Sequence, residues 1–246
     1  MYVAYVDIGN TKTKISFVKN DVYTFGSSIL NSKLMNKEVI GFGVNFECLD
    51  KVYIACVAKK NVLNFVVDYF VEEQGVKPVL LKTKRECLGL VNGYSDFSQL
   101  GIDRWLAMLA VSEECKSYIV ISSGTAITVD VVVDCRHQGG FIVPGLVLMQ
   151  SAIFSNTAII DTDSSVCQDH GFLPNNTQNG VVGGTLYMAG SFINSIINDV
   201  MSETGVKINV FASGGDFSTI QPLINHDVTV VEDLVIQGMI KLNNAC

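Results

Sequence analysis

Short apolar runs rich in Val, Ile and Tyr alternate along the chain with segments of helical periodicity. This alternation predicts a layered α/β fold. At the start of the chain we expect three successive strands joined by tight turns, at residues 2–8, 13–19 and 22–26. A strand at residues 52–57 should follow, because a run without charged positions is typical of a strand that is covered on both faces.

A helix and a further strand should complete this first part. Apolar residues recur at helical spacing from Val62 to Phe70, with Asn61 as the expected N-cap and Gly75 as the stop. Residues 77–81 again favour a strand.

The pattern then begins again. Residues 118–132 predict an apolar strand, a turn of small residues around Gly124 and a second apolar strand, which is the order found in residues 2–19. Two such units about 115 residues apart predict a duplicated architecture of two related α/β halves. We place these halves at residues 1–112 and 113–246. The expected helices and strands around and beyond the boundary are a helix over 103–115, a helix from 146, a long helix through 192–200, a strand at 208–212 and a closing helix at 234–242.

Composition narrows the class of protein. With 246 residues, 48% of them hydrophobic, the chain can bury one large core or two medium ones. A net charge of -7 and the lack of a Lys/Arg cluster argue against a nucleic-acid surface. The longest apolar stretch, residues 141–154, is interrupted by Pro144 and Gly145 and is too short to span a bilayer. We therefore expect neither a nucleic-acid partner nor a membrane.

Seven cysteines are scattered along the chain. They show no CxxC pair and no Cys/His spacing that would suit zinc. An odd number of cysteines, without the pattern of a signal peptide, predicts reduced thiols in the cytoplasm.

The first turn carries an unusual set of polar residues, in the segment DIGNTKTK. Asp7, at the end of a strand, can bind Mg²⁺ directly or through water. Gly9 lets backbone N–H groups approach an anion closely, and Thr11, Thr13 and the lysines can donate to phosphate oxygens. The same residues would also suit an ordinary β-hairpin with solvated lysines.

The second turn, Ser123-Gly124-Thr125-Ala126, repeats this chemistry without an acid or a cation. Taken alone it would suit a tight turn packed in the core. Two glycine turns in related halves are, however, the device by which the actin-like ATPase and sugar-kinase fold holds phosphates.

Further candidate residues follow the strands and open the helices. Asp103 at a helix start suits either an N-cap or a general base, and Arg104 suits either a surface position or a clamp for a substrate carboxylate. Gly214 and Gly215 follow a strand and could hold a nucleotide base. The three histidines show no triad or metal spacing, and we assign them no role.

Eight segments, taken in order, resemble the type III pantothenate kinase family. They are DIGNTKTK (7–14), NGY (92–94), LGIDRW (100–105), GTAITVD (124–130), GGFIVPG (139–145), NNTQNG (175–180), SGG (213–215) and EDLVIQG (232–238). The resemblance implies two ribonuclease H-like (actin-like kinase) halves that face each other across a nucleotide cleft. It also implies ATP-dependent phosphorylation of pantothenate to 4′-phosphopantothenate, the first step of coenzyme A biosynthesis, by a cytoplasmic homodimer.

The resemblance also implies roles for individual residues. The residues implied to hold ATP are Asp7, Ile8, Gly9, Asn10, Thr11, Lys12, Thr13 and Lys14 with Gly124, Thr125, Gly214 and Gly215, and Asp7 is also the implied Mg²⁺ ligand. The residues implied to hold pantothenate are Tyr94, Gly101, Ile102, Asp103, Arg104 and Thr177. Asp103 would take the proton from the substrate hydroxyl, and Arg104 offers a planar fork that suits a carboxylate.

The chain departs from the family at one position. Many members carry an aspartate two residues before the glycine of the second turn, where it binds K⁺ or NH₄⁺. Here this residue is Ser122, which supplies a weaker ligand and no charge. We expect Ser122 either to weaken the dependence on a monovalent cation or to let another group replace the acid. Asp130 remains as a source of negative potential and a candidate metal ligand.

Two other functions stay open. One is a kinase for another small hydroxylated substrate, against which the NGY segment and the Asp103-Arg104 pair speak. The other is a catalytically impaired, nucleotide-binding regulatory protein. Asp7, Asp103 and Thr125 are all present, which argues against such decay.

Overall fold

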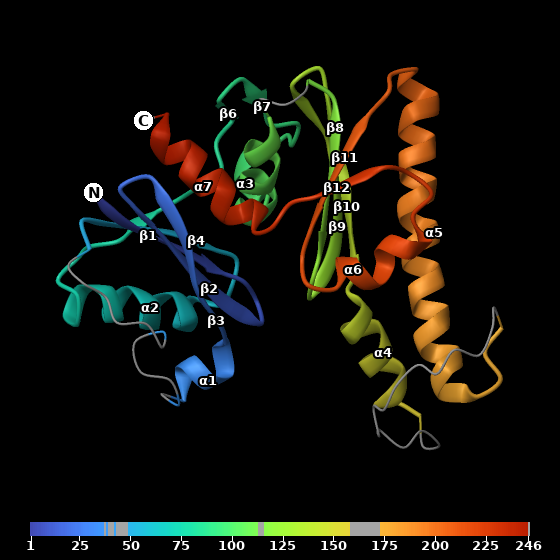
Figure 1. The fold of residues 1–246 in the computed structure, drawn as a ribbon, viewed down its shortest axis with the longest axis horizontal. Helices are drawn as coiled ribbons and strands as arrows, with labels where there is room; N and C mark the ends of the chain where they lie inside the picture. Colours follow the sequence, from blue (N-terminus) through green and yellow to red (C-terminus); the bar gives the residue numbers. More distant parts are fainter. Residues whose placement is uncertain (37, 39–41, 43–48, 113–115, 158–172, 246) are drawn as a thin grey trace. The chain divides into compact units, whose positions relative to one another are not determined.

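The computed structural model describes residues 1–36, 38, 42, 49–112, 116–157 and 173–245. The chain forms two compact units. The first comprises Met1–Glu114, Cys135–Gln138 and Asp233–Cys246, and the second comprises Cys115–Asp134 and Gly139–Glu232. Each unit combines a β-sheet with helices (Figure 1), as the alternating sequence pattern predicts.

The first unit contains a five-stranded sheet with the order β3-β2-β1-β4-β5. Its strands are β1 (Tyr2–Ile8), β2 (Lys12–Lys19), β3 (Val22–Leu30), β4 (Lys51–Cys56) and β5 (Val79–Leu80). The first three run antiparallel to one another, whereas β4 is parallel to β1 and β5 is parallel to β4. The predicted strands are therefore present, but β3 is longer than expected and β5 is shorter.

The two faces of this sheet differ in chemistry. Ala4, Val6 and Ile8 point to a face that is buried against the helices α1 (Asn31–Met35) and α2 (Lys60–Glu72). Because successive side chains of a strand alternate, Tyr5 and Asp7 lie on the opposite face. Their cross-strand partners Ser16 and Lys14 share that face. It is the side on which α7 (Leu234–Asn244) lies, since the Asn243 amide donates a hydrogen bond of 2.9 Å to the Tyr5 hydroxyl.

The start of α2 differs from its prediction. The N-cap is Lys59, not Asn61, and no side chain caps the helix. Apolar burial fixes the helix instead, through Val62, Val66 and Phe70. Gly75, in the left-handed region with φ 65°, follows the end of the helix as expected.

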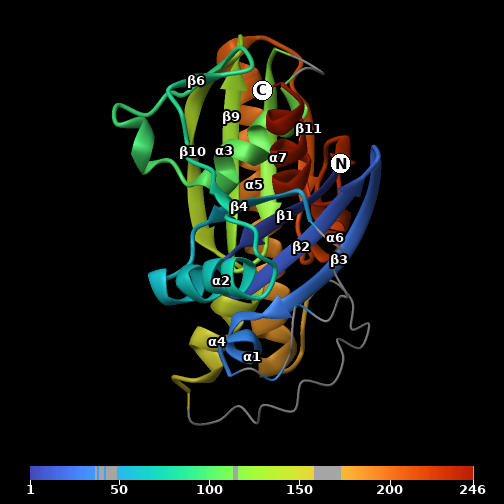
Figure 2. The ribbon, with the colours of Figure 1, turned by 90° about the vertical axis from the view of Figure 1, so that its left-hand side faces the viewer.

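The closing helix α7 packs against α3 (Ile102–Val111) in the first unit (Figure 2). A Cβ atom at Gly238 would overlap the backbone carbonyl of Leu106, so only glycine allows this approach. The Lys241 ammonium donates to the Ala110 carbonyl at 3.3 Å and to Ser112 Oγ at 3.2 Å, which satisfies the end of α3. The compact units thus differ from the halves predicted at 1–112 and 113–246, because the closing helix belongs with the first. The functional division at residue 112 stays a prediction, and residues 113–115 of the expected helix lie outside the described part.

The sheet of the second unit has the order β12-β11-β8-β9-β10. Its strands are β8 (Tyr118–Ser123), β9 (Ala126–Val133), β10 (Arg136–Pro144), β11 (Asn209–Ser213) and β12 (Val228–Val230). Strands β8 and β9 form the predicted hairpin, and β11 runs parallel to both β8 and β12. The first residues of β10 belong to the first unit, where Arg136 pairs with β7 (Leu90–Val91), which in turn pairs with β6 (Glu86–Cys87).

One face of this second sheet forms a core with the long helix α5 (Thr177–Thr204). Ile193 and Ile197 of α5 are fully buried there. By length and composition alone α5 could span a membrane, but its buried stripe is that of a helix packed on a protein core. Gly180, Gly183 and Gly184 lie within α5, so the helix begins well before the residues 192–200 that its periodicity predicts.

The remaining helices are short. They are α4 (Leu146–Phe154) and α6 (Phe217–Ile220), with 3₁₀ turns at Phe97–Gln99 (η2) and Gln221–Leu223 (η3).

Candidate active site

The first turn is held by a single asparagine. Residues Gly9 to Thr11 link β1 to β2, and the Gly9 N–H donates to the Lys12 carbonyl at 3.0 Å. The Asn31 amide donates to the carbonyls of Gly9 at 2.8 Å and Asn10 at 3.1 Å. The Asn31 backbone N–H donates to the Thr11 carbonyl at 2.9 Å. Asn31 therefore fixes the turn, although the sequence gives no signal for this role.

The predicted phosphate-binding residues of this turn divide into two groups. Thr13 is fully buried, and its hydroxyl donates to the Asn31 side chain at 2.8 Å, so it supports the turn from within. Ile8 is also buried, in the core. In contrast, Asn10, Thr11 and Lys12 are exposed. The exposed side chains and the backbone of the turn are the groups that a bound anion could reach.

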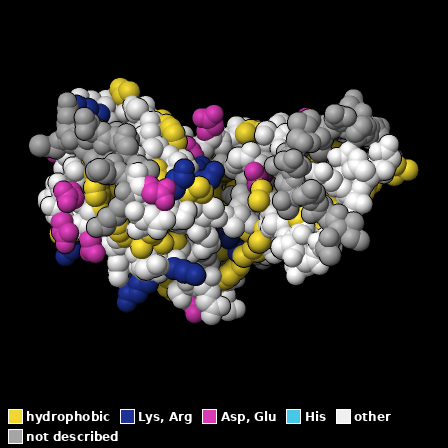
Figure 3. All heavy atoms as spheres, turned by 90° about the horizontal axis from the view of Figure 1, so that it is seen from below, with side chains coloured by type: hydrophobic (Ala, Val, Ile, Leu, Met, Phe, Trp, Pro, Cys, Tyr) yellow, Lys and Arg dark blue, Asp and Glu magenta, His cyan; other side chains and the backbone are white. Residues whose placement is uncertain are grey.

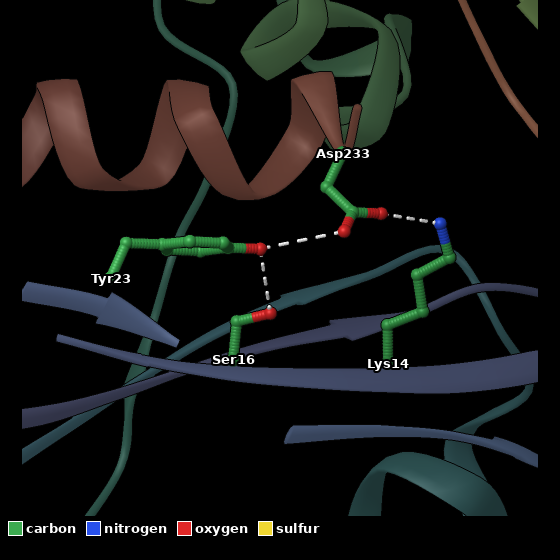
Figure 4. Close-up of polar contacts among 4 residues, drawn as sticks. All are labelled: Lys14, Ser16, Tyr23 and Asp233. Carbon is green, nitrogen blue, oxygen red and sulfur yellow. Dashed lines mark hydrogen bonds and ion pairs between the residues drawn. The ribbon is translucent and has the colours of Figure 1, made fainter. Parts of the chain in front are cut away.

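Lys14 forms an ion pair with a distant acid. Its ammonium lies 2.6 Å from Oδ1 of Asp233, the residue just before α7 (Figure 4). The Tyr23 hydroxyl donates a long hydrogen bond of 3.4 Å to the other carboxylate oxygen and lies 3.1 Å from Ser16 Oγ. Burial raises the pKa of Tyr23, which keeps this hydroxyl protonated. Sequence reasoning gave Asp233 no role.

Asp7 lies close to these charges. Burial and, second, the negative charge of Asp103 raise the pKa of Asp7 to about 7, while Lys14 opposes the rise and Asp233 adds to it. An interaction of this kind requires proximity. The residue implied to hold the metal and the residue implied to accept the proton therefore both belong to the first unit, where the charge of one acts on the other.

The chemistry around Asp7 suits Mg²⁺ that arrives with a nucleotide. Among the described residues, no hydrogen bond engages the Asp7 carboxylate, and no group of three His, Cys, Asp or Glu side chains could hold a metal ion. Mg²⁺ commonly binds through one or two carboxylates, with water and substrate phosphates supplying the other ligands. One half-buried carboxylate beside an exposed turn fits that pattern.

Asp103 occupies the first turn of α3. The N-cap is Gly101, so the alternative that Asp103 is the N-cap is wrong. The Oδ1 atom of Asp103 accepts a hydrogen bond of 2.8 Å from the Arg104 backbone N–H. A Cβ atom at Gly101 would lie 2.5 Å from this same oxygen. Glycine at position 101 therefore leaves room for the carboxylate, while the buried side chain of Ile102 anchors the helix start.

Arg104 belongs to a stacked cluster. It is 6% exposed, and its Nη1 atom donates to the Tyr94 hydroxyl at 3.0 Å. The guanidinium lies 5.9 Å from the centre of the Tyr94 ring. The other partner of Tyr94 is His137, whose ring stacks with a centroid separation of 5.6 Å and an interplanar angle of 18°. A Cβ atom at Gly93 would overlap the His137 carbonyl.

His137 is thus a member of the candidate substrate site that the sequence did not reveal. It is fully buried on β10 of the first unit. No motif or spacing links it to Tyr94, because the two meet only through strand pairing of distant segments.

The segment around Tyr94 is held rigidly. Arg85 donates to the carbonyls of Tyr94 and Ser95, both at 2.9 Å, and its guanidinium lies 5.2 Å from the centre of the Phe97 ring. The Asn92 side chain accepts from the Tyr94 backbone N–H at 2.9 Å. Arg85 and Asn92 therefore fix the backbone that carries Tyr94.

The second turn is shaped by backbone contacts. Gly124 and Thr125 are exposed at the tip of the β8–β9 hairpin, and the Gly145 N–H donates to the Thr125 carbonyl at 2.9 Å. A Cβ atom at Gly145 would overlap the Gly124 carbonyl, and one at Gly214 would overlap the Ser123 backbone. Gly214 also has a φ of 109°, which L side chains rarely adopt.

Three glycine segments predicted from the sequence thus meet at this turn, all within the second unit. They are the hairpin itself, the end of β10 and the segment after β11. Gly215, the last of them, is exposed.

The predicted cation position lies farther along the same hairpin. Ser122 pairs with Thr128 across the two strands, and Asp130 lies two residues beyond on the same face and is buried. Thr128 Oγ1 is buried without a hydrogen-bond partner in the described part of the chain. This strip offers hydroxyl and carboxylate oxygens, which are the donors that K⁺ prefers.

Thr177 is exposed as the first residue of α5. The preceding Asn176 caps the helix, because its side chain accepts from the Asn179 N–H at 2.8 Å. The N-terminal N–H groups of a helix favour anionic or polar ligands.

The comparison with known proteins decides the family. The family model described as type III pantothenate kinase matches residues 4–199. The chain belongs to the type III pantothenate kinase family. A type III pantothenate kinase from Hydrogenovibrio crunogenus is 37% identical over 239 residues, which cover 96% of each protein. Another from Acinetobacter baumannii is 32% identical over 238 residues and covers 96% of this chain and 94% of its own length.

Solved structures with low sequence identity show the fold of this pantothenate kinase family member. A conserved protein from Campylobacter jejuni, described as a Baf family transcriptional activator, has a TM-score of 0.60 at 18% identity and covers 98% of both chains. A protein from Sinorhizobium meliloti, described as a 2-dehydro-3-deoxygalactonokinase, has a TM-score of 0.55 at 10% identity and covers 99% of this chain and 96% of its own. The predicted actin-like kinase fold and the predicted family are confirmed.

Proposed function

We propose that this protein transfers the γ-phosphoryl group of ATP to the primary hydroxyl of pantothenate and so forms 4′-phosphopantothenate. Family membership supports a pantothenate kinase function in coenzyme A biosynthesis. The observation that carries the finer proposal is that the first unit contains two carboxylates in different settings, Asp7 beside the exposed turn after β1 and Asp103 at the start of α3, and that the charge of Asp103 raises the pKa of Asp7. One carboxylate can serve the phosphates and the other can serve the alcohol.

The reaction needs positioning and neutralisation of charge more than covalent help. Mg²⁺, held by Asp7 together with the nucleotide phosphates, would neutralise charge on those phosphates. Lys14 and the N–H groups of the first turn would bind the phosphate oxygens. Asp103 takes the proton of the pantothenate hydroxyl. At the same time the hydroxyl oxygen of pantothenate forms a bond to the γ-phosphorus of ATP, and the bond between that phosphorus and the bridging β-γ oxygen breaks. ADP then leaves with that oxygen.

The substrate would be held by the cluster around α3. Arg104 offers a planar guanidinium fork beside Tyr94, of the shape that binds a carboxylate such as that of pantothenate. Tyr94, Gly101 and Ile102 would contact the rest of the molecule. Thr177 would add a contact, as the family resemblance implies.

The second unit would supply backbone contacts to ATP. Gly124 and Thr125 form an exposed turn that can face phosphate oxygens, and the exposed Gly214-Gly215 segment can approach the nucleotide closely. None of these residues adds charge. For the monovalent cation, we propose a weakened requirement for K⁺ or NH₄⁺, because Ser122 supplies a hydroxyl where relatives carry an acid.

We further propose a homodimer in the cytoplasm. The homodimer is implied by the family resemblance, and exposed apolar side chains of the second unit are available to an interface between copies. They lie on β10, α4 and α5, and include Phe141, Ile142, Val147, Leu148, Tyr187 and Met188, each between 49% and 68% exposed. On the face drawn in Figure 3, Lys and Arg side chains are interspersed with acidic and hydrophobic ones. We propose no nucleic-acid partner, because the net charge of the chain is -7.

The test is ADP release by the purified protein with ATP and Mg²⁺, with and without pantothenate. Release that depends on pantothenate, together with a product of the mass of 4′-phosphopantothenate, is the expected result. Release with another hydroxylated acceptor only would favour a different small-molecule kinase. Nucleotide binding without any release would favour a regulatory protein. The likeness to the Campylobacter jejuni protein gives no support to that last function, because at 18% identity it shows the fold alone.

A further inference from the structure

Lys14 does not pair with its nearest acid along the sheet. The register of β1 and β2 places Lys14 directly opposite Asp7, on the same face. Opposite charges in this arrangement usually attract one another. However, the ion pair that Lys14 forms is with Asp233, at 2.6 Å, and none joins it to Asp7 in the described part of the chain.

The backbone at Asp233 is arranged for this contact. Asp233 has φ 50° and ψ 49°, in the left-handed region that is uncommon for residues other than glycine. It occupies the N-cap position of α7, where an aspartate normally accepts a hydrogen bond from its own helix. No such bond is present, and the carboxylate faces Lys14 and Tyr23 (Figure 4).

The helix that carries Asp233 is itself firmly placed. Gly238 of α7 permits close contact with the backbone of α3, and Lys241 of α7 donates a hydrogen bond to the Ala110 carbonyl at the end of α3. The Asp233 side chain is 14% exposed, whereas that of Lys14 is 35% exposed. Asp233 is therefore the more fixed partner of the ion pair, and the longer and more exposed Lys14 side chain extends to reach it.

We propose that Asp233 is a positioning residue that holds the Lys14 ammonium away from Asp7, so that the Asp7 carboxylate stays available to the Mg²⁺ of the nucleotide. The inference rests on the proposed function. An ammonium has three N–H donors, so Lys14 keeps two for phosphate oxygens while Asp233 accepts one. Without the charge of Asp233, Lys14 pairs with Asp7 and competes with the metal. Asp233 lies outside residues 4–199, the part matched by the family model.

The variant that tests this role is Asp233→Asn. Asparagine tolerates the left-handed backbone and has nearly the same size, so the change removes the charge and little else. The matched control is Glu232→Gln, which removes one negative charge from the exposed neighbouring residue. Thermal unfolding of both variants checks that they fold.

The measurement is the affinity for ADP by calorimetry, with Mg²⁺ and with EDTA in place of Mg²⁺, in the absence of pantothenate. The ratio of the two affinities reports the contribution of the metal and involves no turnover. We expect Asp233→Asn to lower this ratio by roughly 10-fold or more, the range found when a residue that supports a metal ligand is lost. Glu232→Gln should leave it unchanged.

A second variant shows whether Asp233 acts through Lys14. In a Lys14→Met background no ammonium can pair with Asp7, so adding Asp233→Asn should not lower the ratio further. An unchanged ratio in Asp233→Asn, or an equal loss with and without Lys14, would overturn the inference and leave the kinase proposal intact. If the wild-type protein binds ADP no better with Mg²⁺ than with EDTA, the proposed use of Asp7 fails and this inference fails with it.

Discussion

The two glycine turns of this protein are built by different means. The first turn is fixed by hydrogen bonds from the Asn31 side chain and is flanked by the charged residues Asp7, Lys12 and Lys14. The second is fixed by close backbone approach at Gly145 and Gly214, and no charged side chain lies within it. A turn that is held by one side chain leaves neighbouring positions free to carry charged residues, whereas a turn that is held by close backbone packing has a fixed shape and carries no charge. We therefore expect substitutions that change charge to have their main effects in the first unit, and substitutions that change volume to have theirs at the turn of the second unit.

The largest effect should come from Asp103, the acid at the start of α3. Asp103→Asn removes the proton acceptor and should lower kcat by roughly 10²–10⁴-fold, the range typical of losing a general base. The measurement is steady-state ADP release with saturating pantothenate, with thermal unfolding to show that the fold is kept. A rate near that of the wild type would place the base elsewhere.

Asp7 should reveal a conflict between stability and function. Its pKa is raised from 3.8 to about 7 in the folded state, so the contribution of this group to stability is present below pH 3.8 and is lost as the pH rises toward 7. Asp7→Asn cannot ionise, and in EDTA it should be more stable than the wild type, by up to about 4 kcal/mol at pH 8 and by less at pH 5. Urea unfolding at both pH values measures this difference.

The matched control for Asp7→Asn is Asp21→Asn, which changes an exposed acid in the turn between β2 and β3. It should change stability little at either pH. A stabilisation by Asp7→Asn that did not depend on pH would show that charge burial is not its cause.

The second turn should be sensitive to volume and not to charge. Gly145→Ala places a Cβ atom against the Gly124 carbonyl, and we expect a loss of about 1–3 kcal/mol in the free energy of unfolding, as for other overpacked sites. Gly124→Ala is the control, since nothing lies within 4 Å of its Cβ position, and it should stay within about 0.5 kcal/mol. Equal effects in urea unfolding would contradict this account of the turn.

A smaller effect is expected from His137. His137→Leu removes the ring that stacks on Tyr94, and such aromatic contacts correspond to a change of about 2- to 10-fold in an equilibrium constant. We expect KM for pantothenate to rise by this factor with little change in kcat, because the ring positions a binding residue. His226→Leu in the second unit should leave KM unchanged. A fall in kcat at constant KM would give His137 a different role.

The smallest effect concerns the cation. Turnover should be similar in K⁺, NH₄⁺ and Na⁺ buffers, because Ser122 brings no charge to the predicted cation position. Ser122→Asp should introduce a preference for K⁺ or NH₄⁺. A strong K⁺ requirement in the unchanged protein would show that another group, with Asp130 as the first candidate, replaces the missing acid.

Local sequence pattern determined much of the fold. Strict alternation and apolar runs marked β1, β2, β4, β8, β9 and β11, because a strand buried on one or both faces must show that pattern in any protein. Motifs of glycine and polar residues identified both turns and the Asp103-Arg104 pair, since such turns demand particular residue types. Helix caps were less predictable: neither Asn61 nor Asp103 is an N-cap, because burial set these helix starts and no capping bond did.

The tertiary structure decided which partner each polar side chain takes. Lys14 and Asp233 are separated by 219 positions, and Tyr94 meets His137 only because β7 pairs with β10. Asn31 likewise serves a turn more than 20 residues before it. Periodicity reports the face on which a side chain lies, but several acids or rings share that face. Only the packing of distant segments selects one of them, and so the sequence supplied the chemical groups of this site while the fold determined their pairing.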